Sequence, residues 1–262
     1  MSGGTKETVS GLVLAGILFV GSVYMSNRAT KIRDAEDLLN PQLLHTPMAG
    51  FEPLAADIQW IQLVQFMGMG YSSGKKEVYV DRLYRRFDRL TSLDPYFTIA
   101  YHYGTLFLSV EAPEKALSIV DRGLDYIPRE ELDWKLPFYG AFISYQYCEG
   151  DERYAKSLKY LDAAMDHEGY PLYVPTFRAM IVERKDGPAG ALNEWYKLYQ
   201  NCDPSDKTFL RGNVERVASE VLKNPESPEA KQKAEEVLKE LNKGGEEAPP
   251  KKRATRRNVS ET

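Results

Sequence analysis

The stretch FTIAYHYGTLFLSVEAPEKALSIVDRGLDYIP, residues 97–128, decides the fold. It contains two apolar segments, and the second is amphipathic and closes at Pro128. Gly104 in the first segment, and Ala116 and Gly123 in the second, stand where larger side chains are expected on a packing face. Their small size predicts two helices in close contact, and a similar pair should recur along the chain.

The pattern does recur. Residues 172–204 repeat the offsets through Ala179, Ala191 and Trp195, and both units are close to 34 residues long. Residues 133–165 form a middle unit around Gly140, with about five extra residues between its expected helices, and a looser unit starts at Asp57. Unit ends are marked by Pro95, Pro128, Pro171 and Pro204. No alternating strand pattern is present, so the body, residues 57–222, is expected to be all-α.

These units resemble the tetratricopeptide repeat (TPR), a helix-turn-helix with W-x2-L-G-x2-Y, A-x3-F and P positions. The resemblance implies a right-handed α-solenoid of about three to four helix pairs. In it, Phe107, Val120 and Trp195 fill the space beside the small residues, and residues 206–222 cap the last unit. The chain is also similar to bacterial membrane-anchored TPR proteins.

In TPR proteins the first helices of successive units line a concave groove, commonly through the second, fifth, ninth and twelfth positions of each unit. The resemblance therefore implies a protein-binding groove for an extended peptide or a partner helix, with ordinary interhelix packing as the alternative for each aromatic residue. The transferred groove positions are Thr98, Tyr101, Thr105, Leu108, Trp134, Ala141, Ser144, Tyr173, Thr176, Met180 and Glu183. Tyr101 and Thr105 stand where chaperone-tail binders carry a Lys and Asn carboxylate clamp, so that ligand class is not expected.

The first 27 residues are expected to be a short tail and a transmembrane helix. Residues 8–27, TVSGLVLAGILFVGSVYMSN, carry no charge, and about 20 residues match a hydrocarbon core of roughly 30 Å. A cleaved signal peptide is the alternative, but no A-x-A-like site follows and Arg28 comes at once. The charge count favours a cytoplasmic body by one charge, whereas the family resemblance favours a periplasmic one.

Two further segments flank the body. Residues 28–56 hold three prolines and are expected to be a juxtamembrane linker. Residues 223–262 are expected to be a charged helix, starting at Ser227 and Pro228 and either docked or free, followed by a disordered basic tail. The basic residues of this tail favour a solubilising role, with contact to anionic lipid or nucleic acid as the alternative.

Composition and motifs give no sign of an enzyme. A net charge of -4 and a pI near 5.6 argue against nucleic-acid binding, and no catalytic or phosphate-binding motif is present. No histidine has a metal-ligand spacing; His102, between two tyrosines, is expected to be packed or groove-lining. Cys148 and Cys202 are expected at opposite edges of the repeats, too far apart for a disulfide. We therefore expect no cofactor, metal or small-molecule substrate.

The expected function is a membrane-anchored scaffold or adaptor. Residues 8–27 would hold it in the bilayer, and the groove would bind a segment of another protein, such as a subunit of a membrane complex. An envelope assembly factor or chaperone that engages its clients transiently is the alternative.

Overall fold

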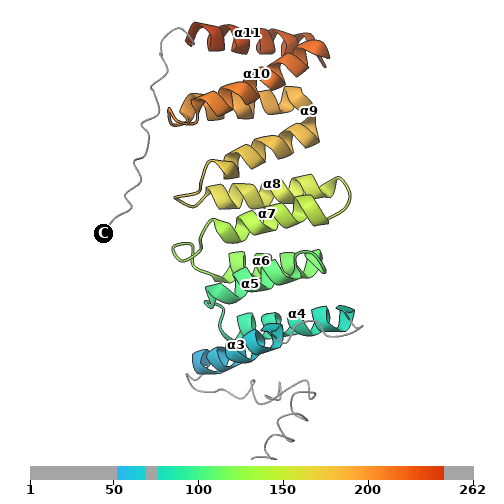
Figure 1. Cartoon of the computed structure of the whole chain (residues 1–262), viewed down its shortest axis with the longest axis vertical. Coiled ribbons are helices and arrows are strands. Elements are labelled where there is room, and N and C mark those ends of the chain that lie inside the picture. Colours follow the sequence, from blue (N-terminus) through green and yellow to red (C-terminus); the bar gives the residue numbers. More distant parts are fainter. Residues whose placement is uncertain (1–51, 69–75, 245–262) are drawn as a thin grey trace, which may run out of the picture. The chain divides into compact units, whose positions relative to one another are not determined.

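The computed structural model describes residues 52–68 and 76–244, which are helical and contain no strand (Figure 1). The all-α prediction is therefore confirmed for the described residues. Their helices are α3 (Glu52–Gly68), α4 (Lys76–Leu93), α5 (Thr98–Leu108), α6 (Pro113–Tyr126), α7 (Lys135–Tyr147), α8 (Glu152–Met165), α9 (Tyr173–Asn201), α10 (Lys207–Lys223) and α11 (Pro228–Gly244).

Among the described residues, no helix has both the length and the apolar character needed to cross a bilayer. The expected transmembrane segment, residues 8–27, and the basic tail after residue 244 lie outside the described residues. Of the expected linker, only its last five residues are described, and they form the start of α3 with Pro53 in its first turn.

The chain divides into two compact units, Met1–Ala55 and Ala56–Thr262. The described residues of the first unit are 52–55, the beginning of α3. In the second unit, each helix from α4 to α11 packs against the next one in the chain, and contacts also join α4 to α6 and α5 to α7 (Figure 1). We call α3, α5, α7, the N-terminal half of α9 and α10 the first helices, and α4, α6, α8, the C-terminal half of α9 and α11 the second helices.

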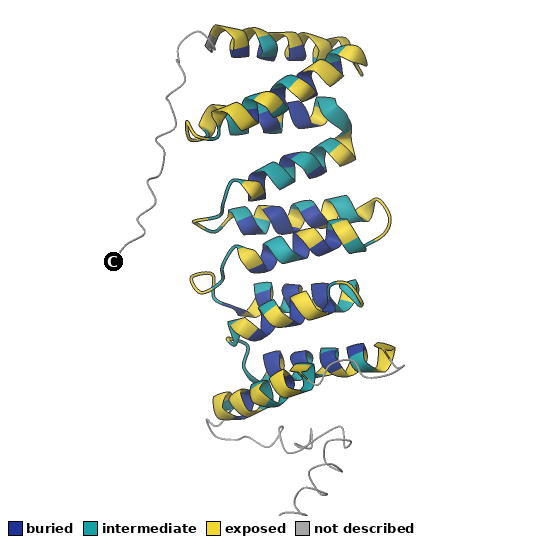
Figure 2. Ribbon diagram, viewed as in Figure 1, coloured by how far each residue is buried: buried dark blue, intermediate teal, exposed yellow. Residues whose placement is uncertain are grey.

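Small buried residues allow these helices to approach closely. A Cβ atom added to Gly104 would lie 3.0 Å from Cγ of Phe87 in α4 and 3.4 Å from Cγ2 of Ile119 in α6. Ala116, Ala179 and Ala191 are also buried. The close approach predicted from these residues is confirmed, and Figure 2 shows the buried residues on the sides where helices meet.

The side chains expected beside the small residues follow the prediction in part. Val120 and Trp195 are buried, but Phe107 is 47% exposed, so the prediction for Phe107 is wrong. Leu108, one residue later, is fully buried instead. One residue turns a helix by about 100°, which places Phe107 on the open side of α5.

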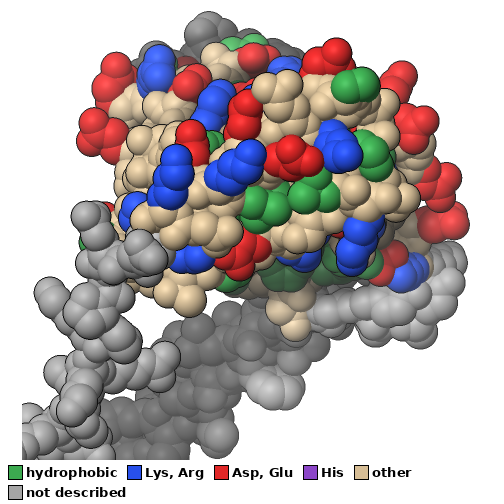
Figure 3. Space-filling model, turned by 90° about the horizontal axis from the view of Figure 1, so that it is seen from above, with side chains coloured by type: hydrophobic (Ala, Val, Ile, Leu, Met, Phe, Trp, Pro, Cys, Tyr) green, Lys and Arg blue, Asp and Glu red, His purple; other side chains and the backbone are tan. Residues whose placement is uncertain are grey.

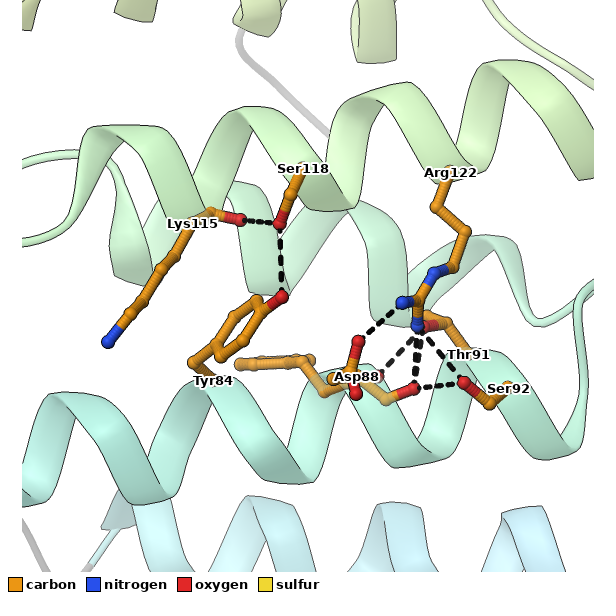
Figure 4. Close-up of polar contacts among 8 residues, drawn as sticks. Tyr84, Asp88, Thr91, Ser92, Lys115, Ser118 and Arg122 are labelled. Atoms are coloured by element: carbon orange, nitrogen blue, oxygen red, sulfur yellow. Dashed lines mark hydrogen bonds and ion pairs between the residues drawn. The ribbon is translucent and has the colours of Figure 1, made fainter.

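The repeat period is visible in polar contacts between α4 and α6 (Figure 4). The Ser118 hydroxyl donates to the Tyr84 hydroxyl at 3.3 Å, and Nη1 of Arg122 donates to the backbone oxygen of Asp88 at 2.7 Å and to Oγ1 of Thr91 at 3.0 Å. Three polar pairs join residues 34 positions apart: Asp81–Lys115, Tyr84–Ser118 and Asp88–Arg122. These second helices therefore repeat with the period seen in the sequence.

The middle unit accommodates its extra residues differently from the expectation. The connector between α7 and α8, residues 148–151, has the same length as the connector 109–112 between α5 and α6. The additional residues instead extend α7 beyond Gly140 and start α8 further ahead of Ser157. They lengthen the two helices and leave the turn between them unchanged.

Helix α9 contains the two helices expected for the third unit. Gly187 (φ 76°, ψ 177°) breaks the helical geometry, and Pro188 begins the second half. The two halves contact each other, because Arg178 in the first half donates to Glu194 in the second at 2.6 Å. A Cβ atom added to Gly187 would also lie 2.7 Å from Oε1 of Glu226.

Helix α11 is the last helix of the described residues. The Ser227 hydroxyl accepts a hydrogen bond from the Ala230 N–H at 3.1 Å and caps the helix. Ala234, Val237 and Leu241 are buried, so α11 is docked and covers α10, which had been expected to form the cap. Seen from the α11 end, charged side chains of both signs are spread over the surface, with apolar side chains between them (Figure 3).

We predict opposite effects for two Gly→Ala substitutions. Gly187→Ala places a side chain in a glycine-only conformation and should lower the free energy of unfolding by about 1–3 kcal/mol. Gly212→Ala, in an exposed turn of α10 with open space around it, should raise it by about 0.5–1 kcal/mol. Urea unfolding of the full chain followed by circular dichroism measures both; equal effects would contradict the Gly187 geometry.

Candidate protein-binding groove

Exposed apolar side chains are unevenly distributed over the described helices. Among the second helices, α4 and α6 expose one large apolar residue each, Val78 and Tyr126, while α8, the C-terminal half of α9 and α11 expose none. Tyr96 and Val110 lie in connectors between helices. The first helices carry the others: Leu54, Ile58, Ile61, Val64, Ile99, Tyr103, Leu106, Phe107, Phe142, Tyr173 and Phe209. The exposed apolar surface of these helices is therefore concentrated on one row.

The sequences of the two kinds of helix explain this difference. In α6, PEKALSIVDRGLDY, apolar residues form one stripe and charged residues the rest. In α7, KLPFYGAFISYQY, apolar and aromatic residues surround most of the helix, with Leu136, Gly140 and Ile143 buried on one side. A helix of this kind has more apolar surface than its neighbours cover, and Phe142 remains 43% exposed.

Helices α7 and α10 and both halves of α9 form an open hollow of about 470 Å³, which we call the aromatic groove. Ring contacts connect its walls: the ring centroids of Phe138 and Tyr173 are 5.2 Å apart, and those of Phe142 and Phe177 are 6.4 Å apart. The lining residues from α7, α9 and α10 are Phe138, Phe142, Tyr173, Thr176, Phe177, Met180, Trp195, Phe209, Asn213 and Arg216.

An ion pair holds the α10 side of the aromatic groove. Arg216 donates to both carboxylate oxygens of Glu183, at 2.7 and 2.8 Å, and Nε1 of Trp195 donates to Glu183 at 3.2 Å. The hydrogen bond from Arg216, together with its charge, lowers the pKa of the Glu183 carboxyl against the opposing effect of burial. Glu183 therefore links α9 to α10 as an ionised group.

The structure brings part of the predicted set to the aromatic groove. Tyr173, Thr176 and Met180 line it. Trp134 contacts Tyr173 edge-on, with ring centroids 5.6 Å apart. Glu183 lies beside the lining and accepts hydrogen bonds from Arg216. Thr98 is half-buried at the start of α5. The remaining predicted residues are buried in the interior and reach no surface: Tyr101, Thr105, Leu108, Ala141 and Ser144.

Packing at Gly123 explains why Tyr101 is buried. The Tyr101 ring lies 3.0 Å from the position of a Cβ atom on Gly123, and its hydroxyl donates to the Pro95 backbone oxygen at 3.1 Å. Burial raises the pKa of Tyr101 to about 12. Leu106 and Phe142, which directly follow the buried Thr105 and Ala141, lie on the open side of their helices.

The transferred positions missed several lining residues: Phe138, Phe142, Phe177, Trp195, Phe209, Asn213 and Arg216. The surplus of aromatic residues in α7 is a sequence signal that identifies Phe138 and Phe142. Phe209, Asn213 and Arg216 lie in α10, which had been assigned a capping role.

The described residues show no sign of a metal centre, since none of their His, Cys, Asp and Glu side chains form a group of three or more that could hold an ion. Within the same residues, Cys148 and Cys202 are unpaired.

Comparison of the chain with protein-family models and with curated proteins gives no match.

His102 is a packed residue between α5 and the start of α7. Its Nε2 atom lies 3.5 Å from Oδ1 of Asp133, and its ring contacts Tyr139 edge-on with centroids 5.8 Å apart. Burial, assisted by the positive charge of Lys135, lowers the pKa of His102, and Asp133 opposes the shift. The neutral form is therefore favoured in the folded chain.

This shift predicts a contribution to acid sensitivity. As the pH falls below about 6.5, the unfolded chain binds the His102 proton first, so the stability contributed by the neutral imidazole is lost between that pH and the lower folded pKa. In His102→Gln, the loss of unfolding free energy between about pH 7.5 and pH 5.5 should be smaller than in the wild type. Urea unfolding at both pH values provides the test, and an unchanged difference would contradict it.

Proposed function

We propose that this chain is a membrane-anchored scaffold with a TPR-like α-solenoid, which holds a segment of a partner protein in the aromatic groove. The observation that carries the proposal is the concentration of exposed large apolar residues on the first helices. Soluble surfaces rarely expose apolar patches larger than a few hundred Å², and larger ones mark interaction sites.

The TPR-like part of the proposal is supported by the period and by the small residues. Polar contacts between α4 and α6 join residues 34 positions apart, the length of one TPR unit. Gly104, Gly140 and Ala179 occupy equivalent places in successive first helices, and all are buried. A right-handed solenoid with a concave row of first helices would place the aromatic groove on its inner side.

A long ligand fits the exposed surface better than a compact one. The aromatic groove spans α7, α9 and α10, and α5, which packs beside α7, exposes Ile99, Leu106 and Phe107 as well. Compact ligands are usually enclosed by their pockets, whereas this hollow is open along a row of helices. A chain segment of a partner, for example a subunit of a membrane complex, matches such a surface.

A transient role in envelope assembly is the second candidate. Met180, a flexible side chain, lies among the aromatic residues of the groove, and Arg216 is the one charged residue in its lining. A lining with so little charge pattern selects weakly among apolar segments. A chaperone-like protein would therefore release its clients quickly, whereas a scaffold would hold one partner in a stoichiometric complex.

The groove is tested by photo-crosslinking in the native host. We expect a benzophenone amino acid placed at Phe142 or at Phe209 to crosslink the same segment of one protein, because both side chains are exposed at the groove. Tyr126, an exposed aromatic residue on a second helix, is the matched control. Equal crosslinking from Tyr126, or none from the groove positions, would contradict the proposal.

The anchor is tested by deleting residues 1–27. The full chain should remain with the membrane fraction after alkaline extraction, and the shortened chain should be released, because residues 8–27 are the uncharged stretch that matches the bilayer core. Release of the full chain under the same conditions would contradict the anchor and leave the groove proposal in place.

A further inference from the structure

We infer that the outer side of α3 rests on the surface of the bilayer in which the chain is anchored. The inference depends on the membrane anchor of the proposed function and concerns a second surface. This surface is separate from the aromatic groove, whose lining comes from α7, α9 and α10. The residues that form it are Leu54, Ile58, Ile61 and Val64 in α3.

These four side chains form one stripe along α3. Their spacing of four, three and three residues follows the helical repeat, and they are between 45% and 57% exposed. Ala56 and Leu63 are buried, and each stands two residues from a member of the stripe, about 200° around the helix. The stripe therefore lies opposite the side on which α3 packs.

The packing side of α3 is covered by the protein itself. Trp60 contacts Tyr103 in α5 edge-on with ring centroids 5.5 Å apart, and Phe66 stacks on Tyr79 in α4 at 4.9 Å. Helices that lie in a membrane interface usually turn a charged side to water. In α3 the corresponding side is packed on α4 and α5, which agrees with the absence of charged residues in this helix after Asp57.

The two carboxylates of α3 do not interrupt the stripe. Glu52 and Asp57 stand in the first two turns of the helix, and the eleven residues of α3 that follow, IQWIQLVQFMG, carry no charge. Ile58, Ile61 and Val64 all lie in this uncharged part. The first turns can therefore stay at the level of the lipid headgroups while the rest of the stripe enters the interface.

The type of side chain on the outer side favours lipid over a protein partner. The stripe consists of branched aliphatic residues, whereas the aromatic groove exposes Phe and Tyr rings. Binding hot spots between proteins are enriched in Trp, Tyr and Arg, and Leu and Val are under-represented there. Acyl chains offer no hydrogen bond or ring contact, so a plain aliphatic stripe is sufficient to bind them.

The place of α3 in the chain brings the stripe to the bilayer. Residues 28–51, which separate the expected span from α3, number 24 and reach at most about 80 Å. Of the described helices, α3 is the closest to the span in sequence, so the anchor keeps its outer side at a high effective concentration near lipid. The last described helix, α11, exposes no large apolar residue.

Depth-dependent fluorescence quenching tests the inference on the full chain. Cys148→Ala and Cys202→Ala remove the native thiols, and Ile61→Cys then carries a single environment-sensitive NBD label. The chain is reconstituted into phosphatidylcholine vesicles that contain lipids with a nitroxide on the acyl chain. Tyr126→Cys, at an exposed position on a second helix, is the matched control. Circular dichroism checks that each variant keeps the helix content of the wild type.

The label at Ile61→Cys should show blue-shifted emission, lose emission to the nitroxide lipids and lie about 5–10 Å into the boundary between headgroups and acyl chains. The label at Tyr126→Cys should show neither effect. Adding Ile58→Glu should reduce the quenching at Ile61→Cys, because a carboxylate on the stripe opposes its burial in lipid.

Two results would overturn the inference while the chain still floats with the vesicles. One is an unquenched label with the emission of a water-exposed group. The other is a blue-shifted label that the nitroxide lipids do not quench, which would mean that residues 28–51 or a second copy of the chain covers α3. A chain that does not float with the vesicles would contradict the anchor of the proposed function, and this inference with it.

Discussion

The close approach of helices at three glycines is the constraint on which the rest of the structure depends. A Cβ atom added to Gly123 would lie 2.5 Å from Cδ2 of Leu136, and one added to Gly140 would lie 3.0 Å from atoms of both Tyr160 and Val120. At Gly104 the neighbour is Phe87. Large side chains of one helix thus occupy the space that a missing side chain leaves on another, which fixes how each unit is set against the next.

Because of this interlocking, the first and second helices expose different kinds of side chain. The first helices use one side, with Gly104 and Gly140, to pack on the second helices, and their other side keeps aromatic residues. The second helices bury a narrower stripe and expose charged residues, many of them in ion pairs between neighbouring helices. The row whose exposed surface is mainly charged is therefore distinct from the row that exposes most of the large apolar residues.

The sequence predicts the packing of the repeats well and the groove less well, for a physical reason. Small residues at Gly104, Ala116, Ala179 and Ala191 indicate close helix packing directly: a Cβ atom on Gly104 would press on Phe87, and the three alanines are buried. The direction in which a helix faces depends on its rotation, and the large ring of Tyr101 over Gly123 turns the transferred positions of α5 into the core. In α9, the equivalent position holds Thr176, and there the transferred positions lie at the groove.

Further cross-helix contacts fix the helices that line the aromatic groove. Arg178 donates to Asp162 in α8 at 2.7 Å and to Glu194 at 2.6 Å, so it ties the helix that carries Tyr173 and Phe177 to two second helices. Arg216 fixes α10 to α9 through Glu183. Helices held in this way would need little rearrangement to bind a partner, so the ordering cost would fall on the exposed side chains, at about 0.5–1.5 kcal/mol for each one immobilised. Under the proposed function, affinity would therefore come from burying the exposed rings of Phe142, Tyr173 and Phe209 on a preformed apolar surface.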